Sequence, residues 1–175
     1  MGMTDWQTIV DQQGPRVWRT AYRLVGNAAD ASDCVQEAFV SALAYSREHT
    51  VRDWSGLMVR LATHRALDLL RRRRRDGCCV ALEDWSGVGA CLSDPTLAAE
   101  QGELAGRLRL ALAQLPARQA EVFCLRTLQE LSYRQIAAQL EMSLPSVAVS
   151  LHRARHTLRH LLKGVAEHES PRVKP

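Results

Sequence analysis

Apolar side chains recur three and four residues apart along most of the chain, which is the spacing of one buried face of an α-helix. No segment alternates long enough to predict a strand, so the expected fold class is all-α, with two small helical domains. The predicted helices are one opening at Gly14-Pro15 and ending at Gly26-Asn27, then Asp30–Ser46, Asp53–Arg75, Leu97–Leu115, Ala117–Leu128, and two further helices between Ser132 and Leu162.

The helical pattern stops between the third and fourth of these helices. From Asp76 to Gly106 there is no basic residue, and glycines at 77, 87 and 89 interrupt the periodicity. Such a stretch is typical of a flexible linker. We therefore expect a first domain over 10–76, an acidic flexible linker over 77–96, a second domain over 97–164, and a polar, disordered tail over 165–175.

The second domain ends in a pattern typical of a helix-turn-helix. Ser132 stands at an N-cap position, and Ile136 and Leu140 share one face of the short helix that follows. Ser143 is placed to cap the next helix, and Pro145 fits its first turn. The inward positions of that second helix are Val147, Leu151, Ala154, Leu158 and Leu161. The exposed positions where a recognition helix would reach base edges are Ser146, Val149 and Ser150.

Charge adds a reason to expect nucleic acid as a partner. The net charge is +4, no acid occurs from Ser143 to Val165, and Arg71–Arg75 is an unbroken run of arginine. Positive segments of this kind suit a phosphate backbone, so two basic modules predict contact at two separated places. The simpler alternatives are a helical hairpin with a solvated basic face and a solvated helix end, where the helix dipole also favours cations.

The helix over Asp30–Ser46 has the opposite character. Asp33, Gln36 and Glu37 lie three and four residues apart, so they form one polar strip. This strip fits a basic protein partner, or it is merely exposed, and charge alone favours the second interpretation.

Other chemistry is weakly supported. The chain has five cysteines and no C-x-x-C motif, so we expect no disulfides, and we expect Cys34 and Cys124 to be core residues. No targeting or membrane segment is evident, so a cytoplasmic location is expected. His152, His156 and His160 share a helix face, yet no carboxylate or cysteine accompanies them as a zinc ligand. Cys78-Cys79 beside the arginine run remains a candidate redox sensor. No nucleophile–base pair or phosphate loop is evident, so we expect no metal, no cofactor and no catalysis.

Five motifs, taken together, resemble one family. DASDCVQEAF over 30–39 is similar to "DAEDLVQETF", and Trp54 followed by VRLATHRALDLLRR over 59–72 is similar to "W…RIARNLAIDLLRR". LPARQ over 115–119, LSYRQIA over 131–137 and HRAR over 152–155 resemble "LPxRQ", "LSYxEIA" and "HRAR". These are signatures of the extracytoplasmic-function group of bacterial RNA polymerase sigma factors, and the resemblance covers about 15–75 and 108–162.

The resemblance implies a role for each domain. The first would be sigma region 2, which docks on the clamp helices of the largest polymerase subunit and reads and melts the −10 promoter element. The second would be sigma region 4, which reads the −35 element and meets the polymerase flap. A separate anti-sigma factor is a further implied partner.

The polymerase-binding residues would be Asp30, Asp33, Gln36 and Glu37, with Phe39 buried beneath. The −10 residues would be Arg60, His64, Asp68, Arg71, Arg72, Arg73, Arg74 and Arg75. The −35 residues would be Tyr133, Arg134, Ser143, Ser146, Val149, Ser150, Arg153 and Arg155.

Four positions depart from the family pattern. His64 replaces an asparagine, Glu141 replaces a common turn glycine, and Ala148 and Ser150 replace lysine and arginine. We therefore expect an unusual or weakly read −35 sequence. Two rival functions stay open: a stand-alone helix-turn-helix regulator, and a zinc or redox enzyme that uses the histidines or cysteines.

Overall fold

The computed structural model describes residues 5–77 and 95–168, with side chains described for 5–77 and 102–163. Within these ranges the protein consists of helices and contains no strand, as the sequence predicts. The helices are α1 (Trp6–Val25), α2 (Ala28–Glu48), α3 (Trp54–Arg75), α4 (Pro95–Leu112), α5 (Ala117–Thr127), α6 (Tyr133–Leu140) and α7 (Leu144–His168).

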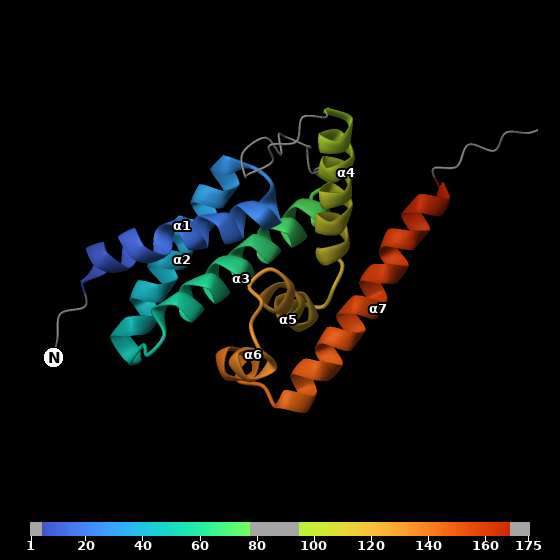
Figure 1. Ribbon diagram of the computed structural model, residues 1–175. Coiled ribbons are helices and arrows are strands. Elements are labelled where there is room, and N and C mark those ends of the chain that lie inside the picture. The colour runs from blue at the N-terminus through green and yellow to red at the C-terminus, as the bar shows by residue number, and fades with distance from the viewer. Residues whose placement is uncertain (1–4, 78–94, 169–175) are drawn as a thin grey trace, which may run out of the picture.

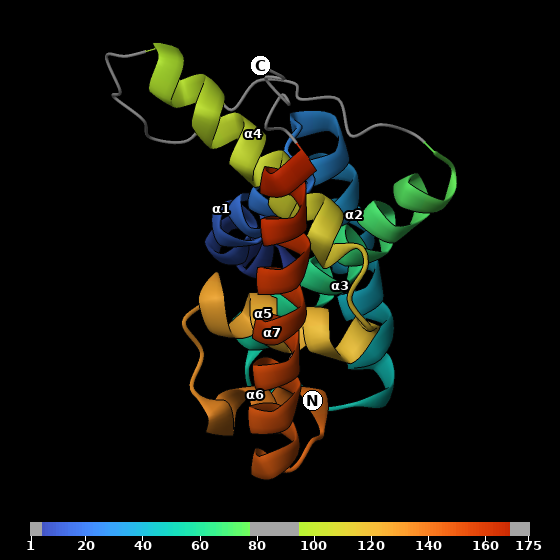
Figure 2. The same ribbon diagram turned by 90° about the vertical axis from the view of Figure 1, so that its right-hand side faces the viewer.

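Helix α3 occupies the centre of the molecule. It packs against α1 and α2 on one side and against α4, α5 and α6 on the other (Figure 1). Helix α7 lies on the outer side of α5 and runs nearly the full length of the molecule, in front when it is seen from that side (Figure 2). The helices of both halves therefore meet around α3.

Helix α1 begins earlier than the sequence predicts. Asp5 caps it by accepting a hydrogen bond from the Thr8 amide, and Pro15 lies inside the helix instead of opening it. Because proline has no N–H, the helix loses one internal hydrogen bond there. Pro15 is exposed and the helix buries Val17 to Val25 on the core side, so tertiary packing extends the helix through a residue that normally ends one.

The predicted helix caps in the helix-turn-helix are present. The Ser132 hydroxyl accepts from the Gln135 amide, and the Gln135 side chain accepts from the Ser132 amide at 2.8 Å, which completes a capping box. Asp53 caps α3 through the Gly56 amide at 2.9 Å. These local bonds satisfy amides that a helix start would leave without partners.

The linker prediction falls mostly on residues 78–94, which lie outside the described residues. Its last two positions, Pro95 and Thr96, begin α4. At the other end, α7 continues to His168, so the first residues of the segment predicted as a disordered tail are helical. Ala166 and Glu167 are good helix formers, which is consistent with this extension.

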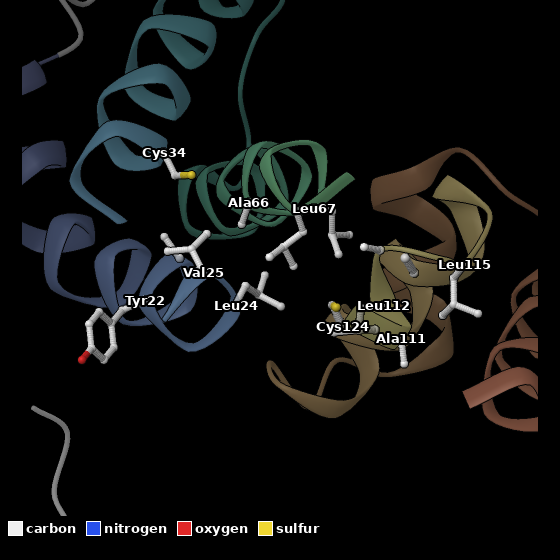
Figure 3. Packing of buried hydrophobic residues seen from close by; sticks show 14 of the residues in the cluster. Tyr22, Leu24, Val25, Cys34, Ala66, Leu67, Ala111, Leu112, Leu115 and Cys124 are labelled. Atoms are coloured by element: carbon white, nitrogen blue, oxygen red, sulfur yellow. The ribbon is translucent and has the colours of Figure 1, made fainter. Parts of the chain in front are cut away.

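One hydrophobic core joins the two halves. Leu24 of α1, Leu67 of α3, Leu112 of α4 and Cys124 of α5 belong to a single buried cluster (Figure 3). A second cluster places Val59 of α3 among buried side chains of α5, α6 and α7. The helices of the two predicted small domains therefore bury apolar faces against one another.

Candidate nucleic-acid and polymerase interfaces

Helix α7 presents its N-terminal residues to the exterior, as the sequence predicts for a recognition helix. Ser143 caps it by accepting from the Ser146 amide at 3.3 Å. Ser146 and Val149 are exposed and Ser150 is half-buried, while Val147 and Leu151 point inward and are fully buried. The buried residues fix the helix against α5 and α6, and the exposed ones are available to a DNA groove.

Exposed arginines occur on both helices of this motif, Arg153 and Arg155 on α7 and Arg134 on α6. At the start of α6, the guanidinium of Arg126 lies 5.7 Å from the ring centre of Tyr133. Arg126 also donates to the Leu131 carbonyl at 2.9 Å, so it supports the loop between α5 and α6. The described side chains of α7 include no acid, so the positive field along this face is unbroken.

The predicted −10 residues at the start of α3 face the second half of the molecule. Arg60 donates to the backbone carbonyl of Gln139 in α6. His64 lies between two carboxylates, with Nδ1 3.2 Å from Asp68 and Nε2 3.7 Å from Glu121 of α5. Glu121 is buried, and Arg118 lies 3.5 Å from its other oxygen. Arg60 and His64 therefore contact α6 and α5, respectively.

The arginine run divides into bound and exposed members. Arg71 donates to Asp68 at 3.1 Å, and its second terminal nitrogen is buried with no hydrogen-bond partner among the described residues. Arg73 forms an ion pair with Asp30 of α2. Arg72, Arg74 and Arg75 are exposed and lie at the C-terminal end of α3, where the helix dipole favours cations.

The acidic strip on α2 is likewise divided. The Asp30 side chain is only 15% exposed, because Arg73 pairs with it and Asn27 caps the helix beside it. Glu37 lies 3.6 Å from Arg65 but remains largely exposed. Asp33 and Gln36 are exposed on the outer face of α2. Asp33, Gln36 and Glu37 are therefore the exposed part of the strip, whereas Asp30 is largely covered.

An apolar groove runs between α1 and α2 near this strip. It is lined by Val10, Pro15, Trp18, Val35 and Phe39, with Gly14 and Arg19 at its edge. Phe39, expected beneath the strip, is half-buried and packs against the core cluster that contains Ala38, Met58 and Ala62.

The cysteines and histidines offer little chemistry in the described part of the chain. Burial raises the pKa of the Cys34 thiol to about 11 and that of Cys124 to about 12, so both are neutral, unreactive thiols near pH 7. Among the described side chains no three His, Cys, Asp or Glu residues gather as metal ligands, although the His156 and His160 rings lie 6.3 Å apart. Cys78 and Cys79 lie outside the described residues. In the described ranges no helix is both long and apolar enough to cross a membrane.

Arg109 is a structurally important residue that the sequence did not reveal. It lies on α4, is 7% exposed, and donates from Nε to the Leu24 carbonyl at the end of α1 at 3.0 Å. Burial lowers the pKa of its guanidinium below the usual value. Gly26 makes room for it: at φ +85° it adopts the left-handed conformation, and a Cβ there would lie 2.6 Å from Arg109 Cζ. In the sequence, Gly26 indicated only the end of a helix, and nothing indicated that Arg109 would be buried beside it.

Comparison with known proteins agrees with this geometry. The family model "Sigma-70 region 2" matches residues 9–76, and "Sigma-70, region 4" matches 105–158. These ranges correspond to α1–α3 and to α4–α7.

Two curated relatives align over most of the chain. The ECF RNA polymerase sigma factor SigE of Mycolicibacterium smegmatis is 35% identical over 96% of this chain, which spans 64% of that protein's length. The ECF RNA polymerase sigma factor SigW of Bacillus subtilis is 28% identical over 90% of this chain and 88% of its own length.

A solved structure has a similar fold. The sigma factor RpoE of Bartonella quintana, solved in complex with the anti-sigma factor NepR, superposes with a TM-score of 0.55 at 21% identity and covers 92% of this chain and 98% of its own. With both regions matched in order, the chain belongs to the extracytoplasmic-function group of the sigma-70 family.

Proposed function

We propose that this chain binds the core RNA polymerase of its bacterial host and directs initiation at promoters carrying matching −10 and −35 elements. The observation that carries the proposal is the placement of two different surfaces on one small protein. The basic recognition face of α7 is exposed, and so are Asp33 and Gln36 on α2, on the other side of α3. One surface suits DNA and the other suits a basic protein partner.

The −35 element would be read as duplex by α7. Ser146, Val149 and Ser150 lie on the early turns of α7, where a recognition helix would meet base edges, and the exposed Arg153 and Arg155 would contact phosphates. Tyr133, Arg134 and Ser143 flank this surface and would hold the helix in register on the backbone. Serine and valine provide few bidentate contacts to bases, which supports the expectation of weak −35 discrimination.

The −10 element would be read by α3 after strand opening. Arg60, His64 and Asp68 lie one turn apart on one face, and Arg71 continues it, followed by the cationic end formed by Arg72 to Arg75. Unpaired bases can be held by such a face while arginines follow the backbone. The chain would act here as a non-catalytic specificity subunit.

The acidic strip would dock on the clamp helices of the largest polymerase subunit, and region 4 would meet the flap. Asp33 and Gln36 are the residues best exposed for this contact, with Glu37 beside them and Asp30 held in place by Arg73. A separate anti-sigma factor would be a second protein partner, as in the related complex. A chain that binds the bacterial polymerase would act in the cytoplasm, where that polymerase transcribes the chromosome.

The test is transcription from fragmented genomic DNA of the host, with purified core polymerase and this chain. Discrete start sites should appear, and they should be lost with Asp33→Arg or Gln36→Ala. Glu48→Arg, which changes an exposed acid at the far end of the same helix, is the matched control and should leave the start sites intact. Retained duplex binding without any transcript, and without retention on immobilised core polymerase, would favour a stand-alone DNA-binding regulator.

A further inference from the structure

A row of three histidines follows the outer face of α7 and belongs to neither the proposed −35 surface nor the polymerase strip. His152, His156 and His160 are four residues apart, so they lie one above the other on one side of the helix, and all three are exposed. The rings of His156 and His160 lie 6.3 Å apart. The buried face of α7 packs on α4, α5 and α6, and Figure 2 shows the other side of this helix open to the exterior.

The row continues the face that would read DNA. Val149 lies three residues before His152, so the two share one side of the helix. At about 1.5 Å per residue, His152, His156 and His160 lie roughly 9, 15 and 21 Å beyond Ser146 along the axis. The major groove of B-DNA is about 12 Å wide. When α7 enters the groove with Ser146, His156 therefore lies at the phosphate rim and His160 just beyond it.

The surroundings of the row on its own helix are positively charged. The exposed cations that flank it are Arg153, Arg155, Arg159 and Lys163. The first acid after the row in the sequence is Glu167, two helical turns beyond His160. The nearest charges along the helix are thus cations, which draw phosphates to the same face.

The helices packed on α7 do not neutralise the row. Among the described side chains, the charged residues of these helices and of the turns beside them are Glu103, Arg107, Arg109, Arg118, Glu121, Arg126, Glu130, Arg134 and Glu141. In this part of the chain Glu103 pairs with Arg107, and Glu121 lies against His64 and Arg118, whereas no ion pair reaches the row. A charged histidine of the row is therefore open to an anion from outside the protein.

Histidine is the side chain that ordinarily gains its charge between about pH 8 and pH 5. A protonated imidazole has two N–H donors and a positive charge, which together suit a phosphate oxygen. The described side chains of α7 include four permanent cations, and protonation of the three histidines would add to them. Because a nearby phosphate favours the charged form of an imidazole, binding of a duplex on this face takes up protons.

Resting on the proposed function, we propose that His152, His156 and His160 are phosphate contacts that form when these histidines are protonated, so that region 4 holds duplex DNA more tightly as the pH falls. The row adds charge to a helix whose first turns have Ala148 and Ser150 where the family pattern has lysine and arginine. The added affinity is present at acid pH and is lost as the pH rises and the imidazoles become neutral.

The test is fluorescence anisotropy with the full chain and a random-sequence duplex of about 25 base pairs, at about pH 6 and pH 8 and at several salt concentrations. The natural chain should bind at least about tenfold more tightly at the lower pH. The slope of log affinity against log salt should steepen by about two, because each further phosphate contact contributes about 0.9. Circular dichroism at both pH values checks that the helices are intact.

His156→Gln combined with His160→Gln removes the two members of the row that lie at and beyond the rim. Both positions are exposed and glutamine is a good helix former, so the helix should persist. This variant should bind within about twofold of the natural chain at the higher pH and lose most of the tightening at the lower pH. His49→Gln is the matched control, because His49 is exposed at the end of α2, and it should keep the full pH dependence.

The opposite substitution makes the charge permanent. His156→Lys combined with His160→Lys should bind at the higher pH about as tightly as the natural chain binds at the lower pH, with a much smaller pH dependence. Since the expected result is a gain of affinity, this variant decides the question even if the glutamine variant does not fold.

Equal affinity and equal salt slope of the natural chain at both pH values would overturn the histidine contacts and leave duplex binding by α7 in place. A folded glutamine variant that keeps the full tightening would do the same. Duplex binding that depends on the row, without any transcription by core polymerase, would retain the contacts and reject the sigma role. A chain that binds no duplex at either pH would reject both.

Discussion

Two glutamates adopt a backbone conformation that favours glycine. Glu130 and Glu141 have φ of 54° and 53°, and Glu141 ends α6 in the turn before the recognition helix. Position 141 is the one where the sequence has a glutamate in place of a common turn glycine, and the structure shows that this glutamate adopts the positive φ of a glycine. A left-handed non-glycine residue costs roughly 1–2 kcal/mol. The turn geometry is therefore imposed by packing of α6 and α7 on either side.

Glu141→Gly should stabilise the protein by about 0.5–1 kcal/mol, since removal of the strain exceeds the added freedom of the unfolded chain. The melting temperature should rise by about 2–4 °C in differential scanning calorimetry. Glu48→Gly, at an exposed right-handed helical position, is the control and should lower it. If Glu141→Gly and Glu48→Gly lowered the melting temperature by the same amount, the turn at Glu141 would carry no strain.

At the scale of single elements, the apolar pattern identifies helices better than their boundaries. Of the inward positions predicted for α7, Val147, Leu151, Ala154 and Leu158 are buried and Leu161 is half-buried, because a 3.6-residue period indicates which face of the helix packs. Pro15 predicted the start of a helix but lies inside α1, because the tertiary contacts of α1 outweigh the loss of one backbone hydrogen bond at the proline. The predicted starts were accurate at Ser132 and Asp53, whose side chains cap α6 and α3, but not at Asp5, which caps α1 well before the predicted start at Gly14-Pro15.

The first turns of α7 carry little positive charge, and this leads to a prediction about DNA. Ser150→Arg should tighten duplex binding and increase the slope of log affinity against log salt by about one, because one more phosphate is neutralised. Fluorescence anisotropy with a random duplex at several salt concentrations measures both. Gln114→Arg adds the same charge outside α7 and should leave the slope nearly unchanged. An unaltered slope in Ser150→Arg would mean that this position does not face the backbone of DNA.

At the scale of the whole molecule, the two regions fold around one core. Leu125 of α5 is fully buried in the cluster that contains Val59 of α3. The residues Trp6, Trp18 and Trp54 all lie in α1–α3. Tryptophan fluorescence, in a Trp85→Phe background, therefore reports the first half, whereas circular dichroism reports all helices.

Leu125→Ala should cost about 2–5 kcal/mol and lower the urea midpoint seen by both probes equally. This follows because a cavity in region 4 also removes contacts from α3. A fluorescence midpoint unmoved by Leu125→Ala in the otherwise natural chain would indicate two independent domains.

The sequence by itself determined the helical class, the capped helix-turn-helix, the basic and acidic faces, and the family. Each of these depends on residues close together along the chain, where helical periodicity, caps and charge runs act locally. Tertiary structure alone decided that Arg60 and His64 contact region 4, that Arg73 holds Asp30, and that a buried Arg109 fits beside Gly26. These contacts join residues tens of positions apart, and they depend on how the helices approach one another, which no local pattern encodes.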